Sequence, residues 1–197
     1  MTHVQGRPRS FDAPQTLERA MGIFWRKGFE GTSLSDLEQA TGLGRQSLYG
    51  AFGDKQSLFK QAVEFYFAHV LKPNFVDVLD APGSARANLE RLFKAWEDYA
   101  CSPGFQGCLV GNAVTDLRST DTELTELLQR KWKLMEDALT RALRRAVADG
   151  EVAATLHPRE TATTLLVLGQ GLAAAARLSR ERSYLRTILD SARKLLD

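Results

Sequence analysis

The chain has 197 residues, of which 44% are hydrophobic and 25% are charged, and its formal net charge is +2. This composition indicates a globular protein with one large core or two smaller ones, and it argues against a disordered or fibrous chain. Because the net charge is close to zero, a nucleic-acid-binding role needs a local basic patch and cannot be inferred from bulk charge.

Targeting and metal-binding patterns are missing from this sequence. The first ten residues, MTHVQGRPRS, contain no apolar signal segment, and Gln170 and Arg177 interrupt the apolar run over 161–178. Such an interrupted run is too short for a bilayer span, so we expect a cytoplasmic protein with no membrane partner. Cys101 and Cys108 form no Cys-x-x-Cys pattern, and no His-x-x-x-His pair occurs. We therefore expect no disulfide framework, no metal site and no cofactor.

A first helix is predicted to begin after Asp12. Asp12 and Gln15 form an N-cap pair, and Pro14 is tolerated because first-turn N–H groups lack partners within a helix. Gly28 is expected to end this helix in the left-handed conformation. The apolar residues that share one helical face are Leu17, Ala20, Met21 and Phe24.

Two short helices with a glycine-containing turn between them are predicted next. Ser33 and Asp36 are expected to cap the second helix, and Gly42 is expected to end it. Gly44 is expected to cap a third helix, whose Leu48 points inward. Two short helices joined in this way form a helix-turn-helix.

The remaining chain is predicted to be helical as well. A fourth helix begins at the Asp54 cap and runs toward Pro73. Turn residues separate five further helical segments, which are expected at 85–100, 108–117, 121–148, 158–178 and 183–196. The sequence thus predicts an all-α protein of about nine helices.

Polar residues gather at the start of the third predicted helix. The second helix of a helix-turn-helix can enter the major groove with its N-terminal residues first. Arg45 and Gln46 have donors and acceptors that can address base edges. Ser47 and Tyr49 can reach phosphate oxygens, and Lys55 adds a cation at the start of the next helix. A solvated face of an αα-hairpin explains the same spacing, so the pattern alone leaves both interpretations open.

These motifs resemble those of the TetR family of transcriptional regulators. The matching residues are FWRKG at 24–28, Thr32-Ser33-Leu34, Asp36-Leu37, Gly42-Leu43 and Ser47-Leu48-Tyr49, followed by Phe52 and Lys55. The match covers the N-terminal part of the chain in motif detail and the remainder only as a helical domain of suitable length. It implies a sequence-specific DNA-binding regulator, a homodimeric repressor that a small-molecule effector or thiol modification releases from a palindromic operator. The implied domains are a DNA-binding domain over 1–55 and an effector-binding and dimerisation domain over 56–197.

The resemblance also implies contacts with a double-stranded DNA operator. The implied contacts are phosphates for Ser33, Tyr49 and Lys55 and base edges for Arg45 and Gln46. Gly44 stands where the family often has a capping Ser or Thr, which puts one phosphate contact in doubt. Arg7 and Arg9 form a short basic arm that could enter the minor groove or belong to a disordered tail.

Two sets of residues in the second domain follow from the same resemblance. The last two helices of each subunit would form a four-helix dimer bundle, with interface residues Leu165, Leu168, Gly169, Gly171, Leu172, Ala175, Leu185 and Leu189. Large apolar groups would line an effector pocket, with lining residues Phe67, Phe93, Trp96, Tyr99, Phe105, Cys108, Trp132 and Met135. Small residues also occur at contacts within a subunit, and large apolar residues often belong simply to a core, so both sets keep a plainer interpretation.

Cys108 is expected to open a helix, where the partial positive charge would lower the pKa of its thiol. Some branches of the resembled family sense oxidants or electrophiles through a cysteine, which is one interpretation of Cys108. A small buried hydrophobic residue is the other.

Other functional classes compete with the regulator. The sequence has no Gly-rich phosphate loop and no His beside a Cys or Ser nucleophile signature, so we expect no enzymatic activity. A non-enzymatic helical adaptor, or an architectural DNA-binding protein without an effector, remains the alternative. Binding to one specific operator would separate a regulator from both.

Overall fold

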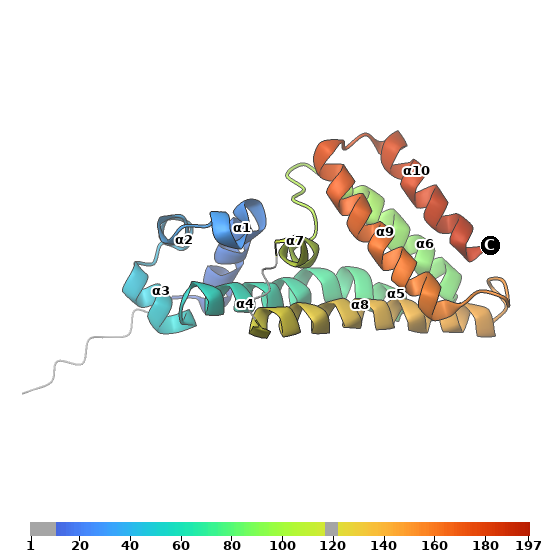
Figure 1. Cartoon of the computed structure of the whole chain (residues 1–197), viewed down its shortest axis with the longest axis horizontal. Helices are drawn as coiled ribbons and strands as arrows, with labels where there is room; N and C mark the ends of the chain where they lie inside the picture. Colours follow the sequence, from blue (N-terminus) through green and yellow to red (C-terminus); the bar gives the residue numbers. More distant parts are fainter. Residues whose placement is uncertain (1–10, 117–121) are drawn as a thin grey trace, which may run out of the picture. The chain divides into compact units, whose positions relative to one another are not determined.

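The computed structural model of the chain describes residues 11–116 and 122–197. These residues form helices and connecting turns with no strand among them, which confirms the predicted all-α fold (Figure 1). The described residues form nine helices when α4 (Lys55–Tyr66), the π-helical segment η1 (Phe67–Val76) and α5 (Asp77–Leu79) are taken as one continuous helix. Packing divides the chain into two compact units, one ending at Ala62 and the other beginning at Val63. The division of roles between residues 55 and 56 stays a prediction.

The first unit contains α1 (Ala13–Gly31), α2 (Leu34–Thr41), α3 (Arg45–Phe52) and the first part of α4. Its core draws on all four helices, and its fully buried members include Ala20, Phe24, Leu37, Leu48 and Leu58. The Phe24 and Phe59 rings meet edge-on, with 5.0 Å between their centroids. This core holds α2 and α3 by their apolar faces and leaves their polar faces to solvent.

α1 begins where the sequence predicts and is interrupted at Gly28. The Asp12 carboxylate accepts the Gln15 N–H at 3.0 Å, which confirms the N-cap. Gly28 has φ 72° and ψ 173°, so it breaks the helix with a positive φ but not in the expected left-handed helical conformation. One further turn reaches Gly31, and the Thr32 hydroxyl fixes it by donating to the Gly28 carbonyl at 2.6 Å.

The helix that begins at Lys55 runs past Pro73, further than the sequence predicted. It continues through Pro73 as η1 and passes into α5. A proline inside a regular α-helix lacks an N–H and clashes with the carbonyl four residues earlier. The wider π-helical turn gives the ring room, and the Asn74 side chain donates to the Val70 carbonyl at 2.8 Å. The chain therefore stays helical past Pro73, as far as Leu79.

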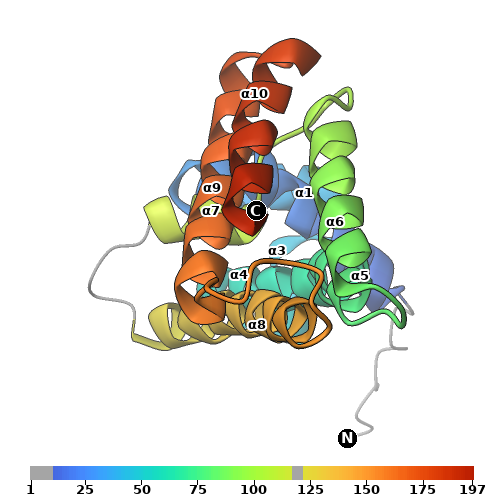
Figure 2. The same ribbon diagram turned by 90° about the vertical axis from the view of Figure 1, so that its right-hand side faces the viewer.

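Five more helices complete the second unit. They are α6 (Ala85–Ala100), α7 (Leu109–Thr115), α8 (Thr122–Ala148), α9 (Pro158–Leu178) and α10 (Arg182–Arg193), followed by the short 3-10 segment η2 (Lys194–Leu196). Figures 1 and 2 both show α6, α9 and α10 side by side, and α8 packs extensively against α9. Leucines without exposed surface fill the space between these helices, among them Leu89, Leu92, Leu139, Leu143 and Leu165.

Ion pairs join α10 to α6. Arg182 and Arg186 both reach the Glu97 carboxylate at 2.8 Å, and Arg193 reaches Glu90 at 2.9 Å. The Glu97 side chain is only 8% exposed. Burial by itself would raise the pKa of Glu97, but the hydrogen bonds from the two guanidinium groups outweigh burial, so the pKa is lowered. Glu97 is therefore a charged anchor for α10.

Candidate functional site

α2 and α3 form the predicted helix-turn-helix. Ser33 Oγ accepts the Asp36 N–H at 3.1 Å, and the Asp36 carboxylate accepts the Ser33 N–H at 2.9 Å, which completes the predicted capping box. Gly42 ends α2 with φ 73° and ψ 9°, a left-handed conformation that glycine adopts without strain. The turn between the two helices therefore depends on glycine at this residue.

α3 begins without a side-chain cap of its own. Gly44 occupies the N-cap position, and glycine has no side chain to accept a helix N–H. The Glu38 carboxylate of α2 accepts the Arg45 N–H instead, at 2.6 Å. Leu48 and Phe52 are buried beneath α3, and their burial decides which face of the helix is exposed.

The predicted DNA-contacting residues are exposed or partly exposed side chains. Arg45, Gln46, Ser47 and Ser33 are exposed, and Tyr49 and Lys55 are partly exposed. The Arg45 guanidinium lies 5.8 Å from the Tyr49 ring centroid, and the Lys55 ammonium lies 4.6 Å from that of Phe29. The Ser33 hydroxyl donates to the Asp36 carboxylate at 2.8 Å, so it would have to change partner to reach a phosphate. Arg7 and Arg9 lie outside the described residues.

Carboxylates lie at the starts of α2, α3 and α4. Glu38 supplies the carboxylate at the start of α3. Asp36 lies in the first turn of α2, and Asp54 accepts the Ser57 N–H at 2.7 Å at the start of α4. The hydrogen bond from Lys27, at 2.6 Å, is the largest cause that lowers the pKa of Asp36 to about 2. The Ser57 N–H likewise lowers the pKa of Asp54. Helix starts favour negative charge, and here protein carboxylates already supply it.

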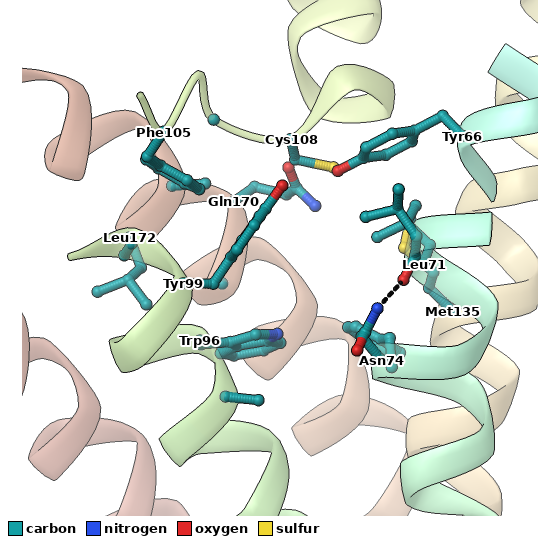
Figure 3. Close-up of a pocket in the computed structure, with 17 residues that line it drawn as sticks. Tyr66, Leu71, Asn74, Trp96, Tyr99, Phe105, Cys108, Met135, Gln170 and Leu172 are labelled. Atoms are coloured by element: carbon teal, nitrogen blue, oxygen red, sulfur yellow. Dashed lines mark hydrogen bonds between the residues drawn. The ribbon is translucent and has the colours of Figure 1, made fainter. Parts of the chain in front are cut away.

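A cavity of about 290 Å³ lies within the second unit, where η1, α6 and α9 face one another (Figure 3). Aromatic side chains form much of its wall, namely Tyr66, Phe75, Trp96, Tyr99 and Phe105. Leu71, Met135 and Leu172 add aliphatic surface, and Asn74, Cys108 and Gln170 add neutral polar groups. None of the described residues that line the cavity is a lysine, arginine, aspartate or glutamate.

Polar groups gather at one end of this cavity. Figure 3 shows the Tyr66 hydroxyl beside the Cys108 sulfur, with Gln170 and the Tyr99 hydroxyl close by. The Cys108 sulfur also accepts the Gly111 N–H at 3.4 Å, so Cys108 caps α7 as the sequence predicted. Burial raises the pKa of the Cys108 thiol, despite hydrogen bonds that lower it, which corrects the expectation of a lowered pKa. Burial also raises the pKa of Tyr66, and that of Tyr99 to about 12.

Some of the expected pocket residues line the cavity and others do not. The lining includes Trp96, Tyr99, Phe105, Cys108 and Met135. Three expected residues lie elsewhere: Phe67 is buried with the Lys131 ammonium 4.6 Å from its ring centroid, Phe93 is fully buried beside Trp96, and Trp132 is partly exposed on α8. The sequence did not assign the lining residues of η1 to the pocket, and it followed this helix only toward Pro73. It also missed Gln170, which could have been found because it is a polar residue inside an apolar run.

The expected dimer residues lie in two kinds of surroundings. The first group is held inside its own subunit, since Leu165, Leu172, Leu185 and Leu189 are at most 2% exposed. These leucines are buried within the single chain, and their role in a dimer interface stays a prediction. In the second group, Gly169 faces Trp96, because a Cβ atom on Gly169 would lie 2.6 Å from Trp96 Cη2. Leu168 and Ala175 are partly exposed, and Gly171 is exposed with open space around it.

A different face of α9 is apolar and exposed. Val167, Gly171, Ala174 and Leu178 follow one another at helical spacing, and Val167 is 57% and Leu178 93% exposed. Tyr184 on α10 and Leu195 on η2 are exposed as well. The sequence did not separate this face from the buried one, because α9 is apolar on several sides. The repeat at 167, 171, 174 and 178 was the available signal.

The described residues lack two other kinds of feature. None of their helices combines the length and the hydrophobicity needed to cross a membrane. Among them there is also no group of three or more His, Cys, Asp or Glu side chains that could hold a metal ion.

Comparisons with known proteins identify the family. The family model of bacterial regulatory proteins of the tetR family matches residues 17–62, and that of the tetracyclin repressor-like C-terminal domain matches residues 83–192. The HTH-type transcriptional regulator YezE of Bacillus subtilis (strain 168) is 34% identical over 148 residues, covering 75% of this chain and 76% of YezE. The HTH-type transcriptional repressor ComR of Escherichia coli (strain K12) is 29% identical over 174 residues, covering 88% and 83%.

A solved structure agrees with these matches over the whole chain. It is a cysteine mutant of the TetR family transcriptional regulator CifR complexed with a 26-bp double-strand operator DNA. CifR is 32% identical, with a TM-score of 0.87 that covers 98% of this chain and 100% of the CifR chain. The helix-turn-helix of α2 and α3 and the helical second unit thus occur together in known regulators. The chain belongs to the TetR family of DNA-binding transcriptional regulators.

Proposed function

We propose that the protein is a repressor that binds a palindromic operator through α3 and leaves it when a small uncharged molecule enters the cavity. The observation that carries the DNA part is the start of α3, where Arg45, Gln46 and Ser47 are exposed above buried Leu48 and Phe52. Such an anchored helix can present its first residues to base edges in the major groove. The complex of CifR with its operator supports binding of operator DNA by this chain.

A homodimer follows from the proposed operator and from an apolar face. One helix-turn-helix reads only a half-site, and two copies related by a twofold axis read a palindrome. The face formed by Val167, Gly171, Ala174 and Leu178, with Tyr184 beside it on α10, is the surface that a second copy would cover. Glycine and alanine within this face would let the paired helices approach closely.

The effector part rests on the chemistry of the cavity. A volume of about 290 Å³ lies at the small end of the range of ordinary ligand pockets, roughly 300–1,000 Å³, so the cavity suits a small ligand. Burial raises the pKa of Tyr66, Tyr99 and Cys108, so these groups stay neutral at pH 7. A charged ligand would lose its hydration without meeting an opposite charge. The cavity therefore favours an uncharged, largely apolar molecule whose polar end meets Tyr66, Cys108 and Gln170.

Thiol modification is the second route of release. Its support is the place of Cys108, whose sulfur lies at the polar end of the cavity, where a ligand would reach it. Its raised pKa keeps the thiol protonated at neutral pH, and the protonated form is the poorer nucleophile. Reversible binding is therefore the favoured route.

Selection of bound sequences from a random duplex pool tests the DNA part. We expect a palindrome to be enriched, because two copies related by a twofold axis read two half-sites. Its enrichment would establish sequence reading and twofold symmetry together. Enrichment of no sequence would instead favour an adaptor or an architectural DNA-binding protein.

Two glycine variants test the cavity as the effector site. Gly169→Ala on α9 forces Trp96 to move and disturbs the cavity wall, whereas Gly22→Ala on α1 meets only the Arg26 side chain at an ordinary 3.7 Å. Uncharged compounds that raise the Tm of the wild type and release the selected operator should lose this effect with Gly169→Ala and keep it with Gly22→Ala. Equal responses of both variants would place the effector outside the cavity.

A further inference from the structure

We propose that Glu38 is a positioning residue that holds the start of α3 and restrains binding to DNA of any sequence. The inference rests on the proposed function, because it takes α3 as the helix that reads DNA. The contacts that support it involve neither the cavity nor the dimer face. They are made by one residue of α2, close to the turn that leads into α3.

Glu38 fixes both sides of this turn. Its main-chain carbonyl accepts the Gly42 N–H at 2.9 Å, which ends α2. Its side-chain Oε1 accepts the Arg45 N–H at 2.6 Å, which starts α3. Gly44 provides no capping side chain, and Glu38 supplies from the neighbouring helix an acceptor for the first N–H of α3, whereas an N-cap side chain would accept the second or third. The backbone position of Arg45 thereby depends on Glu38.

The Glu38 carboxylate also places a negative charge where DNA would approach. The N–H groups at the start of a helix attract anions such as phosphates. α3 has no acidic residue in its own first turn, so Glu38 supplies the negative charge at this end. A phosphate that approaches Arg45 would meet the Glu38 carboxylate, which already accepts the Arg45 N–H. Glu38 therefore opposes phosphate contacts at this point.

The two effects act differently on operator and on random DNA. Binding to random DNA depends on phosphate contacts and charge, whereas operator binding also needs side chains held against base edges. Repulsion by Glu38 weakens both kinds of binding. Its hold on Arg45 strengthens only operator binding. Glu38 should therefore raise the ratio of operator to random affinity.

Glu38→Gln tests the charge, because glutamine keeps an oxygen acceptor of the same reach. We expect its affinity for random duplexes to rise about two- to fivefold, with a smaller change for the selected operator. The matched control is Glu18→Gln, which removes the same charge from an exposed residue of α1. An equal rise in both variants, or no rise in Glu38→Gln, would overturn the charge effect.

Glu38→Ala and the double variant Glu38→Ala/Gly44→Ser test the hold on α3. Gly44 has φ −71° and ψ 159° with open space at its Cβ position, so serine fits there and can cap the helix. Glu38→Ala should lower the Tm by about 2–4 °C and reduce operator affinity, and the added serine, which caps a different N–H group, should restore the Tm more than the operator affinity. A Tm that Glu38→Ala leaves unchanged, or full recovery of operator affinity with the added serine, would refute the hold of Glu38 on Arg45. If the wild type selects no operator, the proposed function fails, while the Tm comparison still decides whether Glu38 caps α3.

Discussion

Arg45 and Lys55 lie at the starts of successive helices, and their surroundings predict different roles in DNA binding. Arg45 is exposed on α3, whereas the Lys55 ammonium lies over the Phe29 ring at the start of α4. Contacts with bases specify a sequence, and contacts with phosphates position the protein. Arg45→Ala should therefore relax base preference at a cost of about 1–3 kcal/mol on the operator. Lys55→Ala should weaken binding to all sequences and reduce its salt dependence.

Titrations of operator, mutated operators and random duplexes at several salt concentrations separate these effects. Arg19→Ala on α1 removes a comparable charge and is the control. If Arg45→Ala binds operator and random DNA as the wild type does, the assignment of Arg45 to the groove is wrong.

Cys108 is buried at the polar end of the cavity, and its surroundings predict how it reacts. Burial raises the pKa of its thiol above the ordinary 9.0, so little thiolate exists at neutral pH. Alkylation by a small electrophile should therefore be slow at pH 7 and accelerate as the pH rises toward and beyond 9. If Cys108 is a sensor, alkylation should lower operator affinity in the wild type and not in Cys108→Ser.

Mass spectrometry must accompany this titration, because Cys101 is a partly exposed second thiol. If both proteins lose DNA equally, or if neither responds while Cys108 is modified, the sensor role fails. Cys108 then keeps the roles that the contacts give it, which are packing and the cap of α7.

At the scale of single helices, local signals predict boundaries well. α6 and α9 have the predicted bounds, because Ser84 caps α6 with a 3.1 Å bond from Ala87 N–H and Pro158 opens α9. The helix expected to run toward Pro73 instead continues past it, because the turns around Pro73 are π-helical and not α-helical. Leu165 is buried within the chain, and periodicity identifies such an apolar face without showing what covers it.

Glu97 couples α6 to α10, and its lowered pKa predicts a dependence on pH. A carboxylate with a folded-state pKa below the ordinary 4.5 stabilises the fold at pH values above 4.5. This contribution is lost as the pH falls through the lowered pKa. Glu97→Gln should therefore lower the Tm at pH 7 by several degrees and make the loss of Tm on acidification less steep.

Thermal unfolding between pH 3 and pH 7 measures this effect. Glu90→Gln is the control, because Glu90 pairs with Arg193 but is more exposed, and exposed pairs contribute little. Equal effects of the two substitutions, or parallel pH profiles for Glu97→Gln and the wild type, would show that burial gives Glu97 no special role.

At the scale of the whole molecule, the proposed repressor needs two copies of the chain. A dimer on a palindrome places its recognition helices about 34–36 Å apart, or a multiple of this distance. An effector that changes this separation would release the operator, because both half-sites could no longer be bound at once. The exposed face of α9 then determines whether such a pair can form.

Gly171 is the residue at which this dimer is most simply tested. It lies within the exposed apolar face, and no atom lies close to a Cβ placed on it, so arginine fits the single chain. A second copy packed against the same face would meet a large charged side chain, so Gly171→Arg should break the dimer and weaken operator binding. Ala148→Arg, at the exposed end of α8, adds the same charge as a control. Sedimentation at micromolar concentration should show a dimer for the wild type and the control and a monomer for Gly171→Arg. A wild-type monomer would refute the dimer, and a dimer that Gly171→Arg leaves intact would place the contact on another face.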